Sequence, residues 1–461
     1  MHNKKIRNEE KKVKYRESYE WPETYGNPDW FLEDRFGLFI HFGLFSVAAR
    51  HEWVMTLEEI GVEGYKKYFE HFNPDLFDAK KWAREAKEAG FKYAVLTAKH
   101  HEGFALWDTK LSEYKITNTK FGRDLVKEYV EAFREEGLKI GLYFSLLDWY
   151  HPDFLVDGYH PERNNKEYME THPGNMDAYA EFMHGQVREL LTDYGKIDYI
   201  WFDFSYPQRD WGDSVGKGKD DWKSESLEQM IVSLQPDIII NDRLGLGRGV
   251  GTPEQYQRST KAEKGGKQIV WEACQTLNNS WGYDRDNLNW KSSEMVIKLL
   301  IDTVSKGGNM LLNIGPNGRG EIDSKTKNIL GEIKNWMRLH SESIYGCTAS
   351  QYEAPADARF TQKGNHLYLH LFSWPYRTLL INGLGGEVEY AQLLNDHSEI
   401  KYIQDEGLSG KRKSHKNLNL EVTEVHIKDK FEEKALLVTL PVQKPDVTVP
   451  VIEFILKDKE E

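Results

Sequence analysis

Short apolar runs that end on polar residues recur between residues 36 and 314, and they define the expected organisation of the chain. The clearest run covers residues 196–204. It begins polar, continues as an apolar stretch rich in aromatic and β-branched residues, and ends on Asp203. This is the pattern of a buried parallel strand that presents one reactive group at its carboxyl end.

Amphipathic segments separate these runs. Residues 79–89 have helical periodicity, with Asp78 as the expected N-cap and Gly90 after the last turn. Further helices are expected over 124–136, 176–194 and 224–234, and further strands over 36–43, 93–97, 140–144, 237–243, 269–273 and 310–314. This alternation over roughly 300 residues predicts a parallel α/β architecture. Its length favours a barrel, and the lack of a helix between the fifth and sixth strands indicates an irregular (β/α)8-like barrel.

After Tyr345 the pattern changes to short β-type runs with turn residues between them. These runs cover residues 366–372, 378–382, 387–393, 418–427, 435–442 and 451–456. They predict a C-terminal antiparallel β-sandwich. We therefore expect a flexible arm over residues 1–20, a catalytic barrel over 21–345 and a sandwich over 346–461.

Composition narrows the choice of partners and compartment. The chain has 461 residues and a formal net charge of −13, which argues against a nucleic-acid or anionic-membrane partner. No window approaches the roughly 18 apolar residues of a membrane helix, and the charged N-terminal stretch has no apolar signal core. We expect a cytoplasmic protein, or a secreted one whose signal peptide has been removed. The sequence leaves open whether the protein forms a homo-oligomer.

Polar and aromatic residues lie toward the carboxyl ends of the expected barrel strands or in the segments just after them, where barrel enzymes carry their chemistry. They include His41, Glu52, Trp53, His100, His101, Tyr143, Trp201, Asp203, Arg243 and Trp281. Hydrogen-bonding groups beside flat rings suit a polyhydroxylated ligand. His100 and His101 are adjacent, so on a regular strand they point to opposite faces, and no H-x-H or H-E-x-x-H motif lies nearby. Hydrogen bonding to ligand hydroxyls is therefore favoured over metal binding, and Cys274 and Cys347 have no metal-ligand spacing.

Five motifs, in this order, resemble the α-L-fucosidase family of glycoside hydrolases over most of residues 20–345. They are Ile40-His41-Phe42-Gly43, Lys99-His100-His101-Glu102-Gly103-Phe104, Trp201-Phe202-Asp203, Asn241-Asp242-Arg243 and Trp271-Glu272-Ala273-Cys274. The resemblance implies a retaining exo-hydrolase without a cofactor that acts on a fucosylated oligosaccharide or glycoconjugate. It makes Asp203 the nucleophile. It assigns sugar binding to His41, Glu52, Trp53, His100, His101, Tyr143, Trp201 and Arg243, with Trp281 beside the methyl group of the sugar.

The second carboxyl group of such a mechanism has two candidates. Retaining cleavage needs an acid/base about 5–5.5 Å from the nucleophile. Glu254 is the first choice, because it lies on an expected loop about a dozen residues after the Asn-Asp-Arg motif. Glu272 is the second choice, because it lies on an expected strand, where a structural, paired carboxylate is the more ordinary interpretation. Members of the family often have a Gly after the nucleophile, whereas this chain has Phe204, which leaves the linkage specificity open.

Two alternative functions stay open at this stage. One is a fucose-binding protein that has kept the fold and lost the chemistry, although the presence of Asp203 with Glu254 or Glu272 argues against it. The other is an exo-hydrolase of a related sugar such as an α-L-galactoside, which differs by one hydroxyl group. Apolar pockets reject one extra hydroxyl only weakly.

Overall fold

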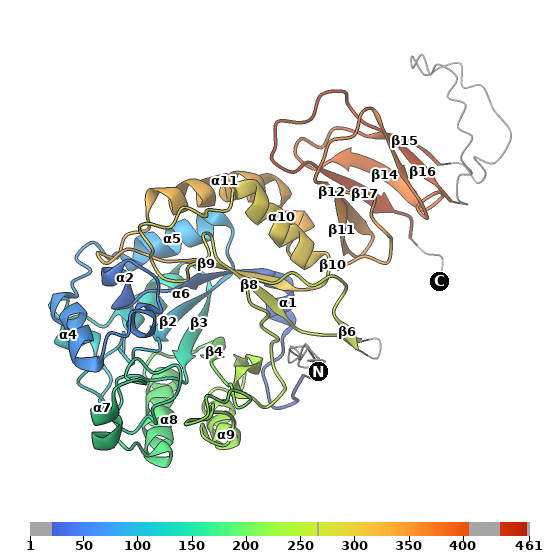
Figure 1. Ribbon diagram of the computed structural model, residues 1–461. Coiled ribbons are helices and arrows are strands. Elements are labelled where there is room, and N and C mark those ends of the chain that lie inside the picture. The colour runs from blue at the N-terminus through green and yellow to red at the C-terminus, as the bar shows by residue number, and fades with distance from the viewer. Residues whose placement is uncertain (1–20, 265–266, 405–433, 459–461) are drawn as a thin grey trace, which may run out of the picture.

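The computed structural model describes residues 21–264, 267–404 and 434–458. The expected arm over residues 1–20 and the expected strand over 418–427 lie outside the described residues. A parallel sheet surrounded by helices forms the larger part of the molecule, and antiparallel strands form the smaller part (Figure 1). The helices within the described ranges are all too short or too polar to cross a membrane.

Seven parallel strands form the central sheet in the order β5-β4-β3-β2-β1-β9-β8. They are β1 (Phe36–Ile40), β2 (Tyr93–Lys99), β3 (Lys139–Ser145), β4 (Tyr199–Asp203), β5 (Ile239–Ile240), β8 (Glu272–Gln275) and β9 (Asn309–Ile314). Nearly every residue of these strands is buried, because helices cover the outer face of the sheet and its own side chains fill the inside. Asp203, the last residue of β4, pairs in register with Ser145, the last residue of β3.

An irregular segment, residues 250–255, occupies the position of an eighth strand between the edge strands β5 and β8. The amide of Val250 donates to the carbonyl of Ile240, at 2.9 Å. On the other side, Glu272 donates its amide to Gly251 at 2.9 Å, and Cys274 donates to Pro253 at 3.0 Å. Both sheet edges thereby find backbone partners without a regular strand. The expected irregular barrel is confirmed.

The α-helices that cover the barrel follow the capping rules that the sequence suggested. They are α1 (Asp29–Asp34), α2 (Phe45–Ala48), α3 (Val54–Leu57), α4 (Val62–His71), α5 (Ala79–Ala89), α6 (Leu125–Glu135), α7 (Lys166–Thr171), α8 (Met176–Thr192), α9 (Ser224–Leu234), α10 (Ser293–Val304) and α11 (Ser324–His340). In α5 the side chain of Asp78 accepts from the amide of Lys81, and Gly90 ends the helix with φ +95°. The expected helices correspond to α5, α6, α8 and α9.

Short elements complete the barrel. Three 3-10 turns are η1 (Ile116–Asn118), η2 (Asp242–Leu244) and η3 (Ser341–Ser343), and a hairpin joins β6 (Glu263–Lys264) to β7 (Lys267–Gln268). The described residues between β5 and β8 contain no α-helix, as expected. The expected strand over 269–273 is displaced, since β8 begins at Glu272, where its register with β9 starts.

The antiparallel part consists of two sheets, which confirms the expected sandwich. The larger sheet has the order β10-β11-β12-β17-β14 and the smaller one the order β13-β16-β15. The strands are β10 (Thr348–Ala349), β11 (Ala358–Lys363), β12 (His366–Leu371), β13 (Thr378–Ile381), β14 (Val388–Leu393), β15 (Lys401–Gln404), β16 (Leu436–Thr439) and β17 (Val451–Leu456). Their inward-facing side chains form a separate apolar core.

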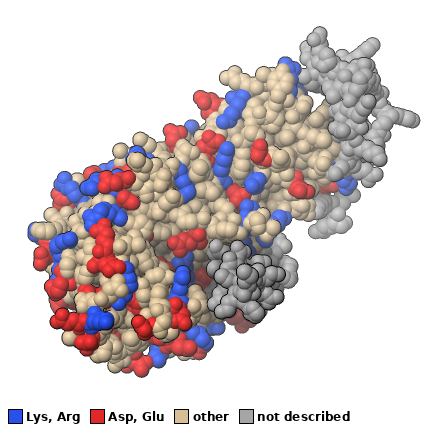
Figure 2. Space-filling view, viewed as in Figure 1, with Lys and Arg blue, Asp and Glu red and all other residues tan. Residues whose placement is uncertain are grey.

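This β-rich part lies beside α10 and α11 (Figure 1). The indole nitrogen of Trp336 in α11 donates to the carbonyl of Val449 at 2.9 Å, and Arg359 in β11 pairs with Asp302 in α10 at 2.7 Å. On the face shown in Figure 2, acidic and basic side chains are intermingled over the barrel and sparser over the β-rich part. The helices α10 and α11 thus connect the two cores.

Candidate active site

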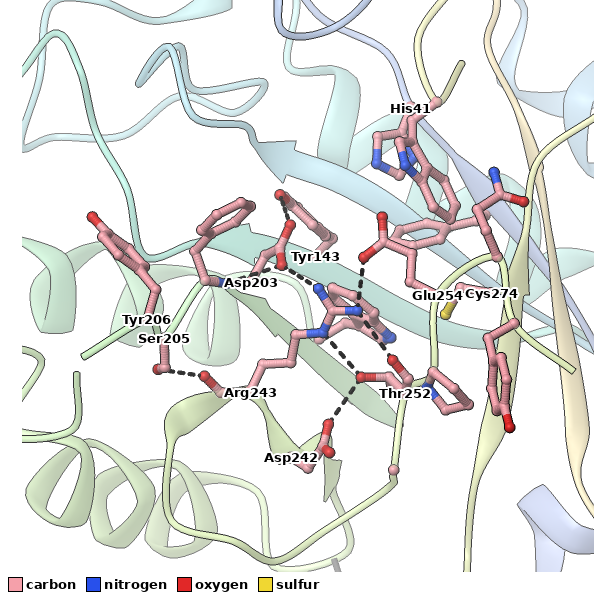
Figure 3. A pocket seen from close by; sticks show the side chains of 18 of the residues that line it. His41, Tyr143, Asp203, Ser205, Tyr206, Asp242, Arg243, Thr252, Glu254 and Cys274 are labelled. Carbon is pink, nitrogen blue, oxygen red and sulfur yellow. Dashed lines mark hydrogen bonds and ion pairs between the residues drawn. The ribbon is translucent and has the colours of Figure 1, made fainter. Parts of the chain in front are cut away.

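A cavity of about 1060 Å³ opens at the carboxyl ends of the barrel strands (Figure 3). Eleven of the twelve residues that the sequence singled out for catalysis or substrate binding line it. They are His41, Glu52, Trp53, His100, His101, Tyr143, Trp201, Asp203, Arg243, Glu254 and Trp281. The twelfth, Glu272, does not line the cavity. Folding therefore brings together residues that are spread over 241 positions of the chain, from 41 to 281.

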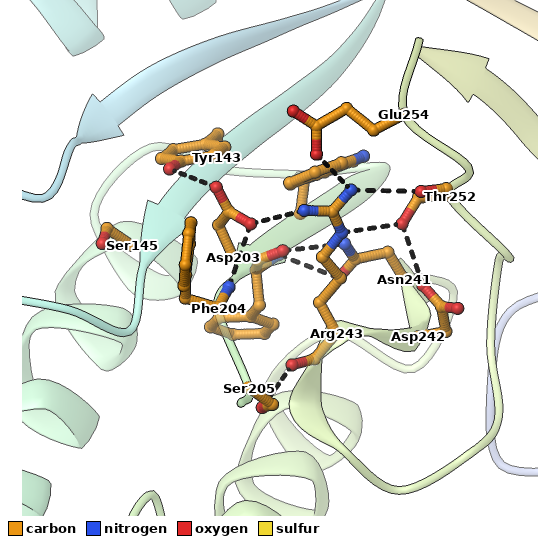
Figure 4. Close-up of polar contacts among 12 residues, drawn as sticks. Tyr143, Ser145, Asp203, Phe204, Ser205, Asn241, Asp242, Arg243, Thr252 and Glu254 are labelled. Atoms are coloured by element: carbon orange, nitrogen blue, oxygen red, sulfur yellow. Dashed lines mark hydrogen bonds and ion pairs between the residues drawn. The ribbon is translucent and has the colours of Figure 1, made fainter. Parts of the chain in front are cut away.

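Asp203 projects from the end of β4 and is held by three hydrogen bonds (Figure 4). Its Oδ1 accepts from a guanidinium nitrogen of Arg243 at 2.6 Å and from the amide of Phe204 at 2.9 Å. Its Oδ2 accepts from the hydroxyl of Tyr143 at 2.9 Å. Charge-assisted bonds of this kind are short and fix the direction of the carboxylate. Asp203 is thus buried and oriented, as a nucleophile requires.

Arg243 lies between the two carboxylates of the cavity (Figure 4). One terminal nitrogen contacts Asp203, and the other contacts Glu254 at 3.0 Å. Burial lowers the pKa of Arg243, but the charges of Asp203 and Glu254 outweigh it and raise the pKa well above its ordinary value. The guanidinium also lies over the ring of Trp201, 4.7 Å from its centre. A single fixed cation therefore sets the relative positions of both acidic side chains.

Glu254 belongs to the segment that closes the barrel. Its backbone forms an isolated parallel bridge with Cys274 of β8, while its side chain is 43% exposed. The next residue, Gln255, has φ +50° and donates its amide to the carbonyl of Cys274 at 2.9 Å. The loop that carries Glu254 is therefore anchored by its backbone, and only the side chain is free to follow a reacting group.

Glu272 lies inside the barrel, beneath the cavity. It is completely buried and accepts hydrogen bonds from Tyr93 at 2.8 Å, Tyr199 at 2.7 Å and the indole of Trp201 at 3.0 Å. Burial raises the pKa of Glu272 to about 7, although these three donors partly oppose the rise. Glu272 thus holds Trp201 from below and cannot itself reach a group in the cavity.

His41 is fixed in one tautomer by a residue that the sequence analysis did not select. Asn313, near the end of β9, donates its amide nitrogen to the carbonyl of Trp281 at 2.7 Å. Its oxygen therefore faces Nδ1 of His41, at 2.6 Å, and this oxygen can only accept. Burial, and then the neighbouring His100, lower the pKa of His41 well below its ordinary value. The neutral ring carries its proton on Nδ1 and keeps Nε2 as an acceptor.

His101 has an equivalent arrangement. The hydroxyl of Ser145 donates its one proton to the carbonyl of Leu147 at 2.8 Å, so its oxygen accepts from Nδ1 of His101 at 2.7 Å. Burial, and then the other histidines, lower the pKa of His101 well below its ordinary value. Its Nε2 lies 3.9 Å from Oδ2 of Asp203 and is left as an acceptor. A ligand hydroxyl group placed beside Asp203 would find this acceptor.

His100 and Glu52 complete the polar side of the cavity. Nδ1 of His100 lies 3.3 Å from a carboxylate oxygen of the buried Glu102. Glu52 accepts at Oε2 from the amides of Trp281 and Gly282, both at 3.0 Å. Its other oxygen, Oε1, is buried and accepts no hydrogen bond from the protein, although Nδ1 of His51 lies 3.3 Å from it. An unsatisfied buried carboxylate oxygen is costly, and a ligand hydroxyl would satisfy it.

Aromatic rings form the apolar floor of the cavity. Tyr143 and Trp201 are stacked with 5.5 Å between ring centres, and Phe39 lies 5.2 Å from Trp201. Trp281 stands at the side, 5.3 Å from the ring of His41. Flat apolar surfaces beside directed polar groups suit a sugar ring, which has C–H faces and hydroxyl edges.

Sequence reasoning missed several partners of these side chains. Asn313, Ser145 and Thr252 hold His41, His101 and Arg243, and Tyr159 lines the outer cavity. Asn313 and Ser145 sit at or near strand ends, as Asp203 does, so strand-end position was the available signal. Thr252 and Tyr159 lie in loops, where no pattern marks them. Among the described residues, no group of three or more His, Cys, Asp or Glu side chains could hold a metal ion.

Comparisons of the sequence and of the fold with known proteins give one consistent result. A family model described as Alpha-L-fucosidase matches residues 3–342. The chain is 31% identical over 354 residues to an alpha-L-fucosidase of Dictyostelium discoideum, which covers 69% of this chain and 71% of the relative. It is similar to the solved structure of alpha-L-fucosidase isoenzyme 1 from Paenibacillus thiaminolyticus, with a TM-score of 0.84, 42% identity, and coverage of 94% and 99%. It is also similar to an alpha-L-fucosidase from Bacteroides thetaiotaomicron trapped as a covalent intermediate, with a TM-score of 0.78, 27% identity, and coverage of 96% and 99%.

Proposed function

The chain belongs to the α-L-fucosidase family, and from this premise we propose that it is a retaining exo-α-L-fucosidase in which Asp203 is the nucleophile and Glu254 the acid/base. Its substrates are fucosylated oligosaccharides or glycoconjugates. The observation that carries the proposal is the placement of two carboxylates on one guanidinium: Asp203 at a strand end and Glu254 on the segment that closes the barrel. Two carboxyl groups facing one cavity are the chemical requirement for retaining glycoside cleavage.

In the first step, an oxygen of Asp203 attacks the anomeric carbon while Glu254 gives its proton to the departing oxygen. A covalent fucosyl-aspartate forms, with inverted configuration at that carbon. Arg243 and Tyr143 hold the carboxylate of Asp203 in place before the attack, which lowers the cost of orienting it. Once the ester has formed, Asp203 no longer carries a charge. The guanidinium of Arg243 then has Glu254, which has become a carboxylate, as its charged partner.

In the second step, water enters on the side that the leaving group has vacated. Glu254 takes a proton from this water as its oxygen attacks the anomeric carbon, and Asp203 departs as a carboxylate. The second inversion restores the original configuration. The exposure of the Glu254 side chain suits both steps, because it must meet a bulky leaving group first and bulk water afterwards.

The histidines select the sugar by accepting hydrogen bonds. His41 and His101 each have Nδ1 engaged by the protein, so each offers a neutral Nε2 acceptor to a ligand hydroxyl. Glu52 adds an unsatisfied oxygen. Because these acceptors are buried and fixed, a substrate that lacks a matching hydroxyl leaves them unpaired and binds poorly. Trp281 and Phe39 supply the apolar contact that suits the methyl group of fucose.

Product stereochemistry tests the proposed nucleophile. In Asp203→Gly, hydrolysis of an activated aryl α-L-fucoside should fall by several orders of magnitude, because no covalent intermediate can form. Azide should then occupy the vacated space and give β-L-fucosyl azide by a single displacement. Asp198→Asn alters the carboxylate just before the opposite end of β4 and serves as the matched control, without azide rescue. Activity of Asp203→Gly above roughly a tenth of wild type would refute the assignment.

A further inference from the structure

The cavity extends beyond the residues proposed to bind fucose. Its outer wall contains Leu57, Tyr159, Phe204, Tyr206 and Arg209, all of which line the same cavity of about 1060 Å³. A drug-sized ligand commonly occupies about 300–1,000 Å³, so the space exceeds the needs of one monosaccharide. We refer to these five residues as the outer wall.

Tyr159 is the centre of an aromatic cluster within the outer wall. Its ring meets those of Phe204, Tyr206 and Trp211 edge to face, with centres 5.5, 5.2 and 5.1 Å apart. Its backbone is fixed as well, because its carbonyl accepts from the hydroxyl of Thr56 at 2.6 Å. Tyr159 is only half-buried, so a fixed ring remains partly uncovered at the cavity.

The strained backbone of Phe204 indicates that the outer wall has a function and is not only an exposed apolar surface. Phe204 has φ +72°, a left-handed conformation that is unfavourable for a residue with a β-carbon. In this conformation its amide donates to Asp203, and its ring lies 4.9 Å from that of His101 and 5.2 Å from that of Trp53. Strained residues are retained where the surroundings enforce them, often at functional sites. The strain places an aromatic ring directly beside the proposed nucleophile.

The position of Asp203 determines which part of a substrate lies near this ring. A nucleophile must come within about 3–3.5 Å of the carbon that it attacks. The anomeric carbon therefore lies beside Asp203, and because the displacement is in line, the bond to the leaving group points away from Asp203 and toward Glu254. With the fucosyl ring held by the inner residues, the next sugar extends past Glu254 into the outer cavity, whose lining includes Phe204 and Tyr159.

We propose that the outer wall is a subsite for the leaving-group sugar, and that it binds a pyranose by stacking its C–H face on Tyr159 and Phe204. This inference rests on the proposed function. Arg209, whose guanidinium lies 6.0 Å from the ring centre of Tyr159, supplies donors for hydroxyl groups at the rim of the stack. Leu57 is 65% exposed and widens the apolar surface at the mouth. Such a wall favours glycan substrates over substrates without a second ring.

Two substrates separate this subsite from the catalytic machinery. α-L-Fucosyl fluoride has no leaving-group sugar, so its kcat/KM reports the fucose site and the two carboxylates alone. A panel of fucosyl disaccharides in several linkages reports both regions. Tyr159→Ala should lower kcat/KM for the preferred disaccharide by about three- to tenfold and leave that for the fluoride within twofold of wild type. Leu57→Ser, a change at an exposed position that should not impair folding, should give a smaller loss in the same direction.

Transfer of the fucosyl group provides a second measurement. In this assay α-L-fucosyl fluoride is the donor. The acceptor is the methyl glycoside of the sugar that leaves when the preferred disaccharide is cleaved. Its hydroxyl attacks the fucosyl-aspartate, Glu254 takes the proton, and Asp203 departs. Tyr159→Ala should lower the ratio of transfer to hydrolysis by a similar factor. Tyr376→Ala, an aromatic residue that is 76% exposed and does not line the cavity, is the matched control and should change neither ratio.

The outcomes distinguish this inference from the proposed function. If the wild type does not hydrolyse the fluoride, the proposed function fails. The subsite is refuted if the wild type hydrolyses the fluoride but cleaves no disaccharide. It is also refuted if Tyr159→Ala lowers kcat/KM equally for the fluoride and the disaccharide, or lowers neither. A selective loss in Tyr256→Ala, which also changes a residue that lines the cavity, with none in Tyr159→Ala would also overturn it.

Discussion

Replacing Glu254 by alanine should remove catalysis without unfolding the protein. The side chain is 43% exposed and has one ion pair, with Arg243 at 3.0 Å. Exposed ion pairs contribute about 0–1 kcal/mol to stability, so the melting temperature should stay within a few degrees of wild type. General acid catalysis contributes about 10²–10⁴-fold, and kcat/KM for a fucosyl disaccharide should fall by that factor. An aryl fucoside with a low-pKa phenol needs little protonation and should lose less in this first step.

Azide identifies the step that remains slow in Glu254→Ala. The activated substrate still forms the fucosyl-aspartate, which then accumulates because no base activates water. Azide attacks without a base, so it should raise turnover and give α-L-fucosyl azide by double displacement. The product from Asp203→Gly has the opposite anomeric configuration. Proton NMR of the two azides therefore assigns the nucleophile and the acid/base independently.

Glu272 is the internal comparison for this experiment. Glu272→Ala would leave Tyr93, Tyr199 and Trp201 without a buried acceptor, at a cost of roughly 5 kcal/mol or about 10 °C in melting temperature. No azide rescue is expected, since Glu272 does not line the cavity. The reasoning fails if azide restores turnover to Glu272→Ala or Glu272→Gln and has no effect on Glu254→Ala.

Two further predictions concern metal and pH. Prolonged treatment with EDTA should leave the rate unchanged, because the proposed roles use only side chains, and a loss reversed by a divalent ion would contradict this. The pKa of Glu272 is about 7 in the folded protein against an ordinary value of 4.5. Between these two pH values the folded state keeps the proton of Glu272 and the unfolded state releases it. This group therefore makes the free energy of unfolding fall as pH rises from about 4.5 to about 7. Glu272→Gln should lack this term of about 3 kcal/mol, and urea unfolding curves whose pH dependence matches wild type would argue against it.

The sequence predicted best those elements whose signal is local. Strands such as β2 and β4 are buried on both faces and therefore appear as continuous apolar runs. Helix α5 carries its own cap and stop signal in Asp78 and Gly90. By contrast, β8 starts three residues later than expected, because its position is set by pairing with β9 and with Gly251, and neither contact is visible locally.

The candidate site was predictable where a reactive side chain follows a strand, and not where its partner comes from elsewhere. The sequence marks His41 and His101, but the tautomers depend on Asn313, 272 positions away, and on Ser145, 44 positions away. The sequence ranked Glu254 ahead of Glu272 because the first was expected on a loop and the second on a strand. The structure adds what no local pattern shows, namely that Glu272 is completely buried and enclosed by three donors.

The closing segment explains why Glu254, the proposed acid/base, is hard to place from sequence and yet held in position by the fold. Residues 250–255 include Gly251 and Pro253, which are poor strand formers, and Pro253 has no amide to donate. The segment needs no strand propensity, because β8 donates to it on one side. On the other side, Arg243 donates to both the hydroxyl and the carbonyl of Thr252, at 3.0 and 3.1 Å. The same guanidinium binds Asp203, so the position of Glu254 is tied to the proposed nucleophile through Arg243 rather than through regular secondary structure. The proposed acid/base therefore depends on a carbonyl that accepts from β8 and on Thr252, which accepts from Arg243.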